Sequence, residues 1–149
     1  MDKFLIKKQL DYKNNYIYVE THSAAYRIKK SRIEKNLSLK ELSSLSGISY
    51  NYITALESGT FKTNFKVLKK LSKTLDKPIA YLGYFEDMPE DNFTDKLKKA
   101  RHYHGDTKKD LADKLGANEC TIRYWENEKQ VPSIKYIKVI EEYMEILHK

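Results

Sequence analysis

Cysteine, proline and glycine are scarce in this chain of 149 residues, which contains one, three and five of them, respectively. The lone Cys120 has no partner for an intrachain disulfide, so a disulfide framework is excluded. Few glycines and prolines leave little material for a long disordered linker, and we expect order almost throughout. No apolar run approaches the roughly 18 residues of a membrane span, and no secretion signal is evident. These absences favour a soluble globular protein of the cytoplasm.

Acidic residues are outnumbered, and the formal net charge is +7. Residues 1–85 hold 16 Lys and Arg against 7 Asp and Glu, and residues 96–149 hold 12 against 9. Residues 86–95 hold 5 acidic residues and no basic one. A positive surplus favours association with a polyanion, because neutralising phosphates releases counterions. The acidic stretch separates two basic segments.

An internal repeat, offset by 69 residues without gaps, relates these two segments. Shared composition alone does not readily produce matches of apolar, glycine and charged residues at one offset. The repeat therefore predicts an all-α protein with two tandem helical domains, residues 23–86 and 93–149, joined by an exposed acidic linker, residues 87–92. The matched pairs include Arg32 and Arg101, Leu42 and Leu111, Gly47 and Gly116, Ile53 and Ile122, and Glu57 and Glu126.

Helix start and stop signals recur in both copies. A Ser or Thr followed three residues later by an acidic residue predicts a capping box, and a glycine one short helix later suits a left-handed turn. In the first helix we expect Ala25, Ile28 and Ile33 to face the core. The predicted caps are Ser38 with Glu41 and Ser49 in the first copy, and Thr107 with Asp110 and Asn118 in the second. Asn64 begins a further helix in the first copy, and Pro132 with Ser133 opens the closing helix of the second.

Residues 1–22 match neither copy. A first run with Phe4, Ile6, Lys8 and Leu10, and a second run over residues 16–19, flank a polar stretch at residues 11–15. This pattern predicts a short β-hairpin. Because an isolated two-stranded hairpin is marginally stable, it would need to pack on the first domain or on another subunit.

Both copies share a longer pattern, which resembles the Cro and phage-repressor class of helix-turn-helix proteins, the Xre family. The resemblance covers roughly residues 24–85 and 93–149. It implies two repressor-like bundles that bind double-stranded DNA sequence-specifically, as a bacterial or phage transcriptional regulator, most often a repressor, without a cofactor. The matching segments are residues 32–42, 46–49 and 53–59 in the first copy, and Arg101, residues 107–112, 115–118, 121–127 and 131–133 in the second.

By this resemblance, the helix that follows each glycine turn enters the major groove of DNA. Asn51 suits a bidentate contact with adenine. The resemblance implies that the base-reading residues are Tyr50, Asn51, Tyr52, Thr54 and Ala55 in the first copy, and Glu119, Cys120, Thr121, Arg123 and Tyr124 in the second.

Phosphate contacts position such a protein without specifying sequence. The candidates are Leu39, Lys40, Lys62, Thr63 and Lys66 in the first copy, and Lys108, Lys109, Lys129 and Gln130 in the second. The first recognition helix has no Lys or Arg, the second opens with Glu119, and Glu128 stands where the first copy has Gly59. Net charge favours the first copy as the DNA-binding one and Arg123 favours the second, so the ranking stays open.

Charged and metal-ligating residues have structural explanations. In the family, Arg32 with Glu57 and Arg101 with Glu126 form structural ion pairs. His102 and His104 lie near the end of a helix, where we expect exposed side chains rather than a metal site. No nucleophile constellation, carboxylate pair or phosphate-binding glycine loop supports an enzyme, and Cys120 lacks partners for nucleophilic catalysis.

A second class of function stays open. An antitoxin, antirepressor or phage-encoded inhibitor could keep this fold and use Tyr50, Tyr52, Tyr124 or the predicted hairpin to bind a protein. Within the DNA-binding class, the two copies could grasp successive half-sites, or one could bind DNA while the other forms a homodimer.

Overall fold

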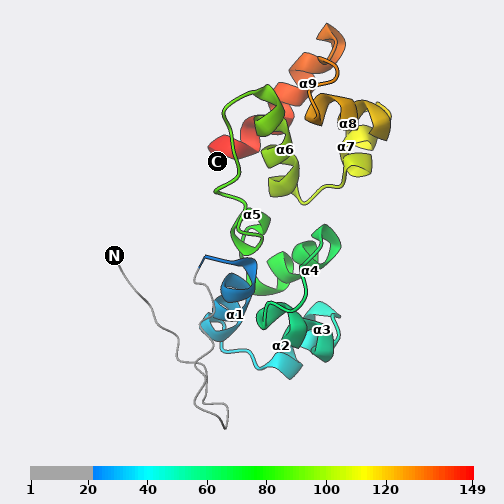
Figure 1. Cartoon of the computed structure of the whole chain (residues 1–149). Helices are drawn as coiled ribbons and strands as arrows, with labels where there is room; N and C mark the ends of the chain where they lie inside the picture. Colours follow the sequence, from blue (N-terminus) through cyan, green and yellow to red (C-terminus); the bar gives the residue numbers. More distant parts are fainter. Residues whose placement is uncertain (1–21) are drawn as a thin grey trace.

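The computed structural model describes residues 22–149, and the regular structure in this range is entirely helical. The predicted all-α class is confirmed. The predicted hairpin lies outside the described residues. Figure 1 shows two groups of helices, which we call the first bundle, α1 to α5, and the second bundle, α6 to the C-terminus. The first comprises α1 (Ala24–Glu34), α2 (Leu39–Ser46), α3 (Tyr50–Glu57), α4 (Phe65–Leu75) and α5 (Ile79–Leu82). The second comprises α6 (Phe93–His104), α7 (Lys108–Leu115), α8 (Glu119–Glu126), α9 (Ile134–Met144) and a terminal 3-10 turn, Glu145–His148.

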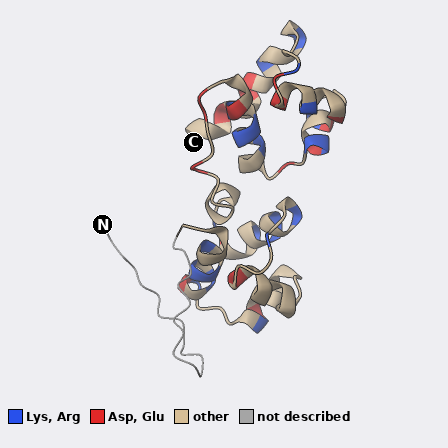
Figure 2. Cartoon of the chain, viewed as in Figure 1, with Lys and Arg blue, Asp and Glu red and all other residues tan. Residues whose placement is uncertain are grey.

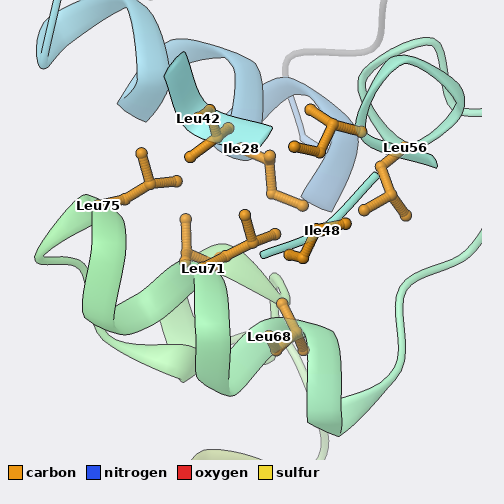
Figure 3. Close-up of a cluster of buried hydrophobic side chains, with 9 residues drawn as sticks. Ile28, Leu42, Ile48, Leu56, Leu68, Leu71 and Leu75 are labelled. Atoms are coloured by element: carbon orange, nitrogen blue, oxygen red, sulfur yellow. The ribbon is translucent and has the colours of Figure 1, made fainter. Parts of the chain in front are cut away.

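The first bundle closes around its own apolar core. Three leucines of α4, spaced three and four residues apart, lie on one face of that helix and point toward α1 and α2 (Figure 3). This burial stabilises all five helices against one another. The core residues are Ile28, Leu42, Ile48, Ile53, Leu56, Leu68, Leu71, Leu75 and Leu82.

A separate apolar core holds the second bundle together. Trp125 of α8 is buried, and its ring meets the ring of Tyr136 of α9 edge-on with the centroids 5.2 Å apart. The buried members are Leu97, Leu111, Ala112, Ile122, Trp125 and Ile140. Two separate cores are typical of two domains, and each core lies within one of the predicted domain ranges.

Local capping explains where the helices begin. The Ser38 hydroxyl accepts a hydrogen bond from the Glu41 backbone N–H at 3.1 Å, and the Ser38 N–H donates to the Glu41 carboxylate at 2.7 Å. Thr107 and Asp110 form the same reciprocal pair at 3.1 and 2.8 Å. Both predicted capping boxes are thus confirmed. Asn118 occupies the N-cap position of α8 as predicted, but its side chain accepts no cap hydrogen bond.

The predicted inward face of α1 needs a correction at Ile33, whose exposed fraction is 49%. Ile28 is buried as expected. Five residues of α-helix turn the side chain by about 140° from the starting direction. A single helix face therefore cannot bury both isoleucines.

The two bundles meet through His102 near the end of α6. Its imidazole ring contacts Phe65 of α4 and Phe85 edge-on, with centroid distances of 5.2 and 5.0 Å. The predicted exposure of His102 is therefore wrong. His104 is also half-buried and stacks on Tyr143 at 4.2 Å. The sequence at the end of one helix carries no information about aromatic residues that another part of the chain brings into contact with it.

Polar and backbone contacts reinforce this junction. Asp106 is 1% exposed and accepts a hydrogen bond from Lys69 of α4 at 3.3 Å. Buried Lys99 donates to the backbone oxygen of Glu86 at 2.7 Å, which fastens the linker to α6. Gly105 has a φ of +67°, and a Cβ atom there would lie 3.0 Å from Ile79 Cδ1 of α5. The contacts fix how the bundles sit relative to each other.

We expect acid to weaken the fold through His102. Burial lowers the pKa of His102, because desolvation disfavours the charged ring, although its hydrogen bond to the Lys98 carbonyl opposes this. The unfolded chain then binds the proton more readily, and the free energy of unfolding should fall as the pH drops below about 6.5. Denaturant titrations between pH 5.5 and 7.5 measure this slope. His102→Gln should flatten it, whereas the same change at exposed His148 should not; equal slopes in all three proteins would contradict the assignment.

Candidate nucleic-acid interface

The helix α3 presents one face to the core and the other to solvent. Ile53 and Leu56 are buried, which sets the rotation of the helix about its axis. Tyr50, Asn51 and Thr54 are consequently exposed. The Thr54 hydroxyl donates to the Tyr50 carbonyl at 2.9 Å. Three predicted base-reading residues therefore share the outward face at the start of α3.

Tyr52 and Ala55, the other predicted base-reading residues of the first bundle, are half-buried. Tyr52 packs against the first core, and its ring lies 5.9 Å from that of Phe61. Tyr52 is therefore only partly open to solvent, because the loop after α3 folds back over it. Its base-reading role stays a prediction.

Lysines lie on the segments that precede and follow α3 in the chain. Lys40 of α2, Lys62 of the following loop and Lys66 of α4 are exposed. Within residues 22–149, no salt bridge engages any of these three. Leu39 and Thr63 are half-buried, so Leu39 offers its backbone N–H at the open end of α2 rather than its side chain. Figure 2 shows α3 without Lys or Arg and α4 with several.

A groove of about 320 Å³ runs between the start of α3 and α4. Its lining includes Ser49, Lys66 and Lys70. Lys70 is a further candidate phosphate contact that the sequence analysis did not select. The signal was present, because Lys66 and Lys70 are four residues apart and so share one face of α4.

The second bundle presents α8 in the same way, but with different chemistry. Ile122 and Trp125 are buried, whereas Glu119, Arg123 and Tyr124 are exposed. Cys120 and Thr121 are half-buried. The Arg123 guanidinium lies 3.3 Å from the Cys120 sulfur. Hydrogen bonds from Tyr124 and Arg123 lower the pKa of the Cys120 thiol.

Positive charge is weaker around α8. The Lys108 ammonium lies 3.9 Å from the Glu126 carboxylate, so part of its charge is already neutralised. Lys109, Lys129 and Gln130 are exposed, but so are Asp113, Glu119 and Glu128. The balance of charge favours the first bundle for contact with phosphates.

An ion pair attaches each outward helix, α3 or α8, to the first helix of its bundle. Arg32 Nε of α1 donates to Glu57 Oε1 of α3 at 2.6 Å, and Arg101 Nε of α6 donates to Glu126 Oε1 of α8 at 2.6 Å. The Glu57 hydrogen bond raises the pKa of Arg32 against the opposing effect of burial. Both carboxylates are buried, which explains why these charges serve the fold rather than catalysis.

The comparisons with known proteins bear on the first bundle. Residues 28–82 match a family described as Helix-turn-helix. This match spans from α1 through α5 and does not extend into the second bundle. It supports a DNA-binding helix-turn-helix regulator in general. No curated protein and no solved structure matches the chain.

Two further features concern other kinds of site. Across residues 22–149, every helix is too short or too polar to cross a membrane. In that same range, no three His, Cys, Asp or Glu side chains gather where they could hold a metal ion.

Proposed function

We propose that the first bundle binds double-stranded DNA sequence-specifically through α3, and that the chain is a transcriptional repressor. The observation that carries this proposal is the outward face of α3. Its inner face is held by the core and by the Arg32–Glu57 pair, while Tyr50, Asn51 and Thr54 project beside lysines that no salt bridge engages among the described residues. A rigidly held helix with polar side chains at its first turn fits the major groove.

Within this proposal the contacts divide by chemistry. The Asn51 amide accepts from the adenine N6 amino group and donates to N7, which distinguishes adenine from the other bases. Lys40, Lys62 and Lys66 neutralise phosphates on the flanking backbone. The first N–H groups of α2, at Leu39 and Lys40, add a helix N-terminus that favours an anion. Repression follows when the bound protein covers a promoter.

Removing a base-reading side chain should weaken specific binding. We expect Asn51→Ala, and Arg123→Ala where α8 also reads bases, each to cost about 1–3 kcal/mol, because a bidentate contact is lost. Titration of a labelled operator duplex measures the effect. Lys73→Ala, an exposed change at the far end of α4, is the matched surface control and should leave affinity nearly unchanged. Wild-type affinity in both Asn51→Ala and Arg123→Ala would refute the base-reading assignment.

A second candidate function follows from apolar residues beside α8. Val131 and Ile134 are 82% and 91% exposed, and Tyr124 is 40% exposed. Exposed apolar groups of this kind favour a protein-binding role for the second bundle, with a homodimer as its simplest form. Sedimentation of the chain alone and with operator duplex tests this alternative, because one chain per duplex would leave it without support.

A further inference from the structure

We infer that one chain reads an asymmetric operator made of two unlike half-sites, in a fixed order and at a fixed spacing. This inference rests on the proposed function and extends it to α8. It concerns the class of DNA that the protein selects. A palindromic operator would need two recognition helices with the same base-reading side chains, related by a two-fold axis.

The two bundles share the same backbone conformation at three matched turns. Three left-handed residues of the first bundle each have a left-handed counterpart 69 residues later in the second, whereas Asp76, at a φ of 52°, has none. The φ angles are 56° and 67° for Asn36 and Gly105, 66° and 64° for Gly47 and Gly116, and 77° and 58° for Gly59 and Glu128. Glu128 adopts the left-handed conformation although this conformation is unfavourable for a residue with a side chain. Each bundle therefore holds its outward helix in the same internal geometry.

The two outward helices also lie on one side of the molecule in the view of Figure 1, where α3 is on the right of the first bundle and α8 on the right of the second. One face of the chain therefore carries both of them.

Contacts at the junction hold the two bundles in one arrangement. His102 of α6 is held between Phe65 and Phe85, and Lys69 of α4 reaches Asp106 at 3.3 Å. Burial raises the pKa of Asp106, but hydrogen bonds from Lys114 and Tyr143 outweigh it, so the pKa lies below its ordinary value and the charge that Lys69 meets is retained. A fixed junction gives α3 and α8 one spacing along the duplex.

The outward side chains of α3 and α8 differ, so the two half-sites that they read differ as well. The outward face of α3 has Asn51, which suits adenine, whereas α8 has Arg123, which suits guanine. Glu119 at the start of α8 can accept from a cytosine amino group, where its charge is tolerated. The weaker positive charge around α8 matters less once α3 is bound, because the second contact is then intramolecular.

The test begins with selection of bound fragments from random duplex DNA by the full chain. We expect an enriched sequence without internal symmetry, spanning two successive major-groove segments, with one chain bound per duplex. Scrambling either half should lower affinity at least tenfold. Inverting the second half in place, or moving it by 5 base pairs, should cost as much as scrambling it, because α8 then meets the wrong strand or the wrong face of the duplex.

Variants assign the halves to the bundles. Asn51→Ala should lose discrimination only in the first half and Arg123→Ala only in the second, while Lys73→Ala changes neither. A junction variant, His102→Ala with Lys69→Ala, should regain part of the affinity for the shifted duplex, provided that its melting curve shows folded protein. Failure to regain it would overturn the role of the junction in setting the spacing.

The outcomes separate this inference from the proposed function. Absence of any enriched sequence at every salt concentration would overturn both. An enriched palindrome bound by two chains, or a single short site indifferent to the second half or to its inversion, would leave DNA binding intact and overturn the asymmetric operator.

Discussion

Raising the salt concentration from 50 to 200 mM should weaken binding to operator DNA by about 10³-fold. Six of the phosphate contacts predicted from the sequence are lysines: Lys40, Lys62, Lys66, Lys108, Lys109 and Lys129. Each neutralised phosphate contributes about −0.9 to the slope of log affinity against log salt concentration, so six contacts give a slope near −5. Titrations of one labelled duplex at four or more salt concentrations measure this slope.

The size of the slope also indicates whether one bundle or both bundles contact DNA. If only Lys40, Lys62 and Lys66 of the first bundle take part, the slope should be near −3 and the loss about 40-fold. Lys66→Ala should reduce the slope by about one, whereas Lys73→Ala on the same helix should leave it unchanged. A slope near zero would remove the phosphate assignments altogether.

Arg101→Ala should lower the free energy of unfolding by about 3–5 kcal/mol. Arg101 donates to both oxygens of Glu126, at 2.6 and 3.0 Å, and to the Asp106 carbonyl at 2.9 Å. The Glu126 side chain is 1% exposed, so removing the guanidinium leaves a buried carboxylate whose nearest remaining cation is Lys108 at 3.9 Å. Urea unfolding at pH 7, followed by circular dichroism and by Trp125 fluorescence, measures the loss.

Two comparisons test the cause of that loss. Arg32→Ala in the first bundle should cost less, because the side chains of Arg32 and Glu57 are more exposed, at 11% and 7%. Replacing both partners, with Arg101→Met and Glu126→Leu, should recover much of the stability, because no uncompensated charge stays buried. A double variant no more stable than Arg101→Ala would contradict this explanation.

The helices and their boundaries were largely predictable, because the signals act within a few residues. The capping boxes at Ser38 and Thr107 and the left-handed glycines at positions 47 and 116 depend on local hydrogen bonds and local sterics. The half-burial of Tyr52 and His102 depends instead on contacts with other segments. Tyr52 is half-buried because Phe61 folds over it, and His102 because Phe65 and Phe85 enclose it.

By itself, the amino-acid sequence determined the helical class and the repeat, since both are written in spacing or in matched positions. The resemblance to the family implied the pairs Arg32–Glu57 and Arg101–Glu126, which the structure contains. Only the tertiary structure decided how the second bundle sits against the first. That relation depends on contacts such as Phe65 with His102 and Lys69 with Asp106, which join residues 37 positions apart. No local sequence pattern encodes such a contact, because the two residues meet and stabilise the junction only when both bundles have folded.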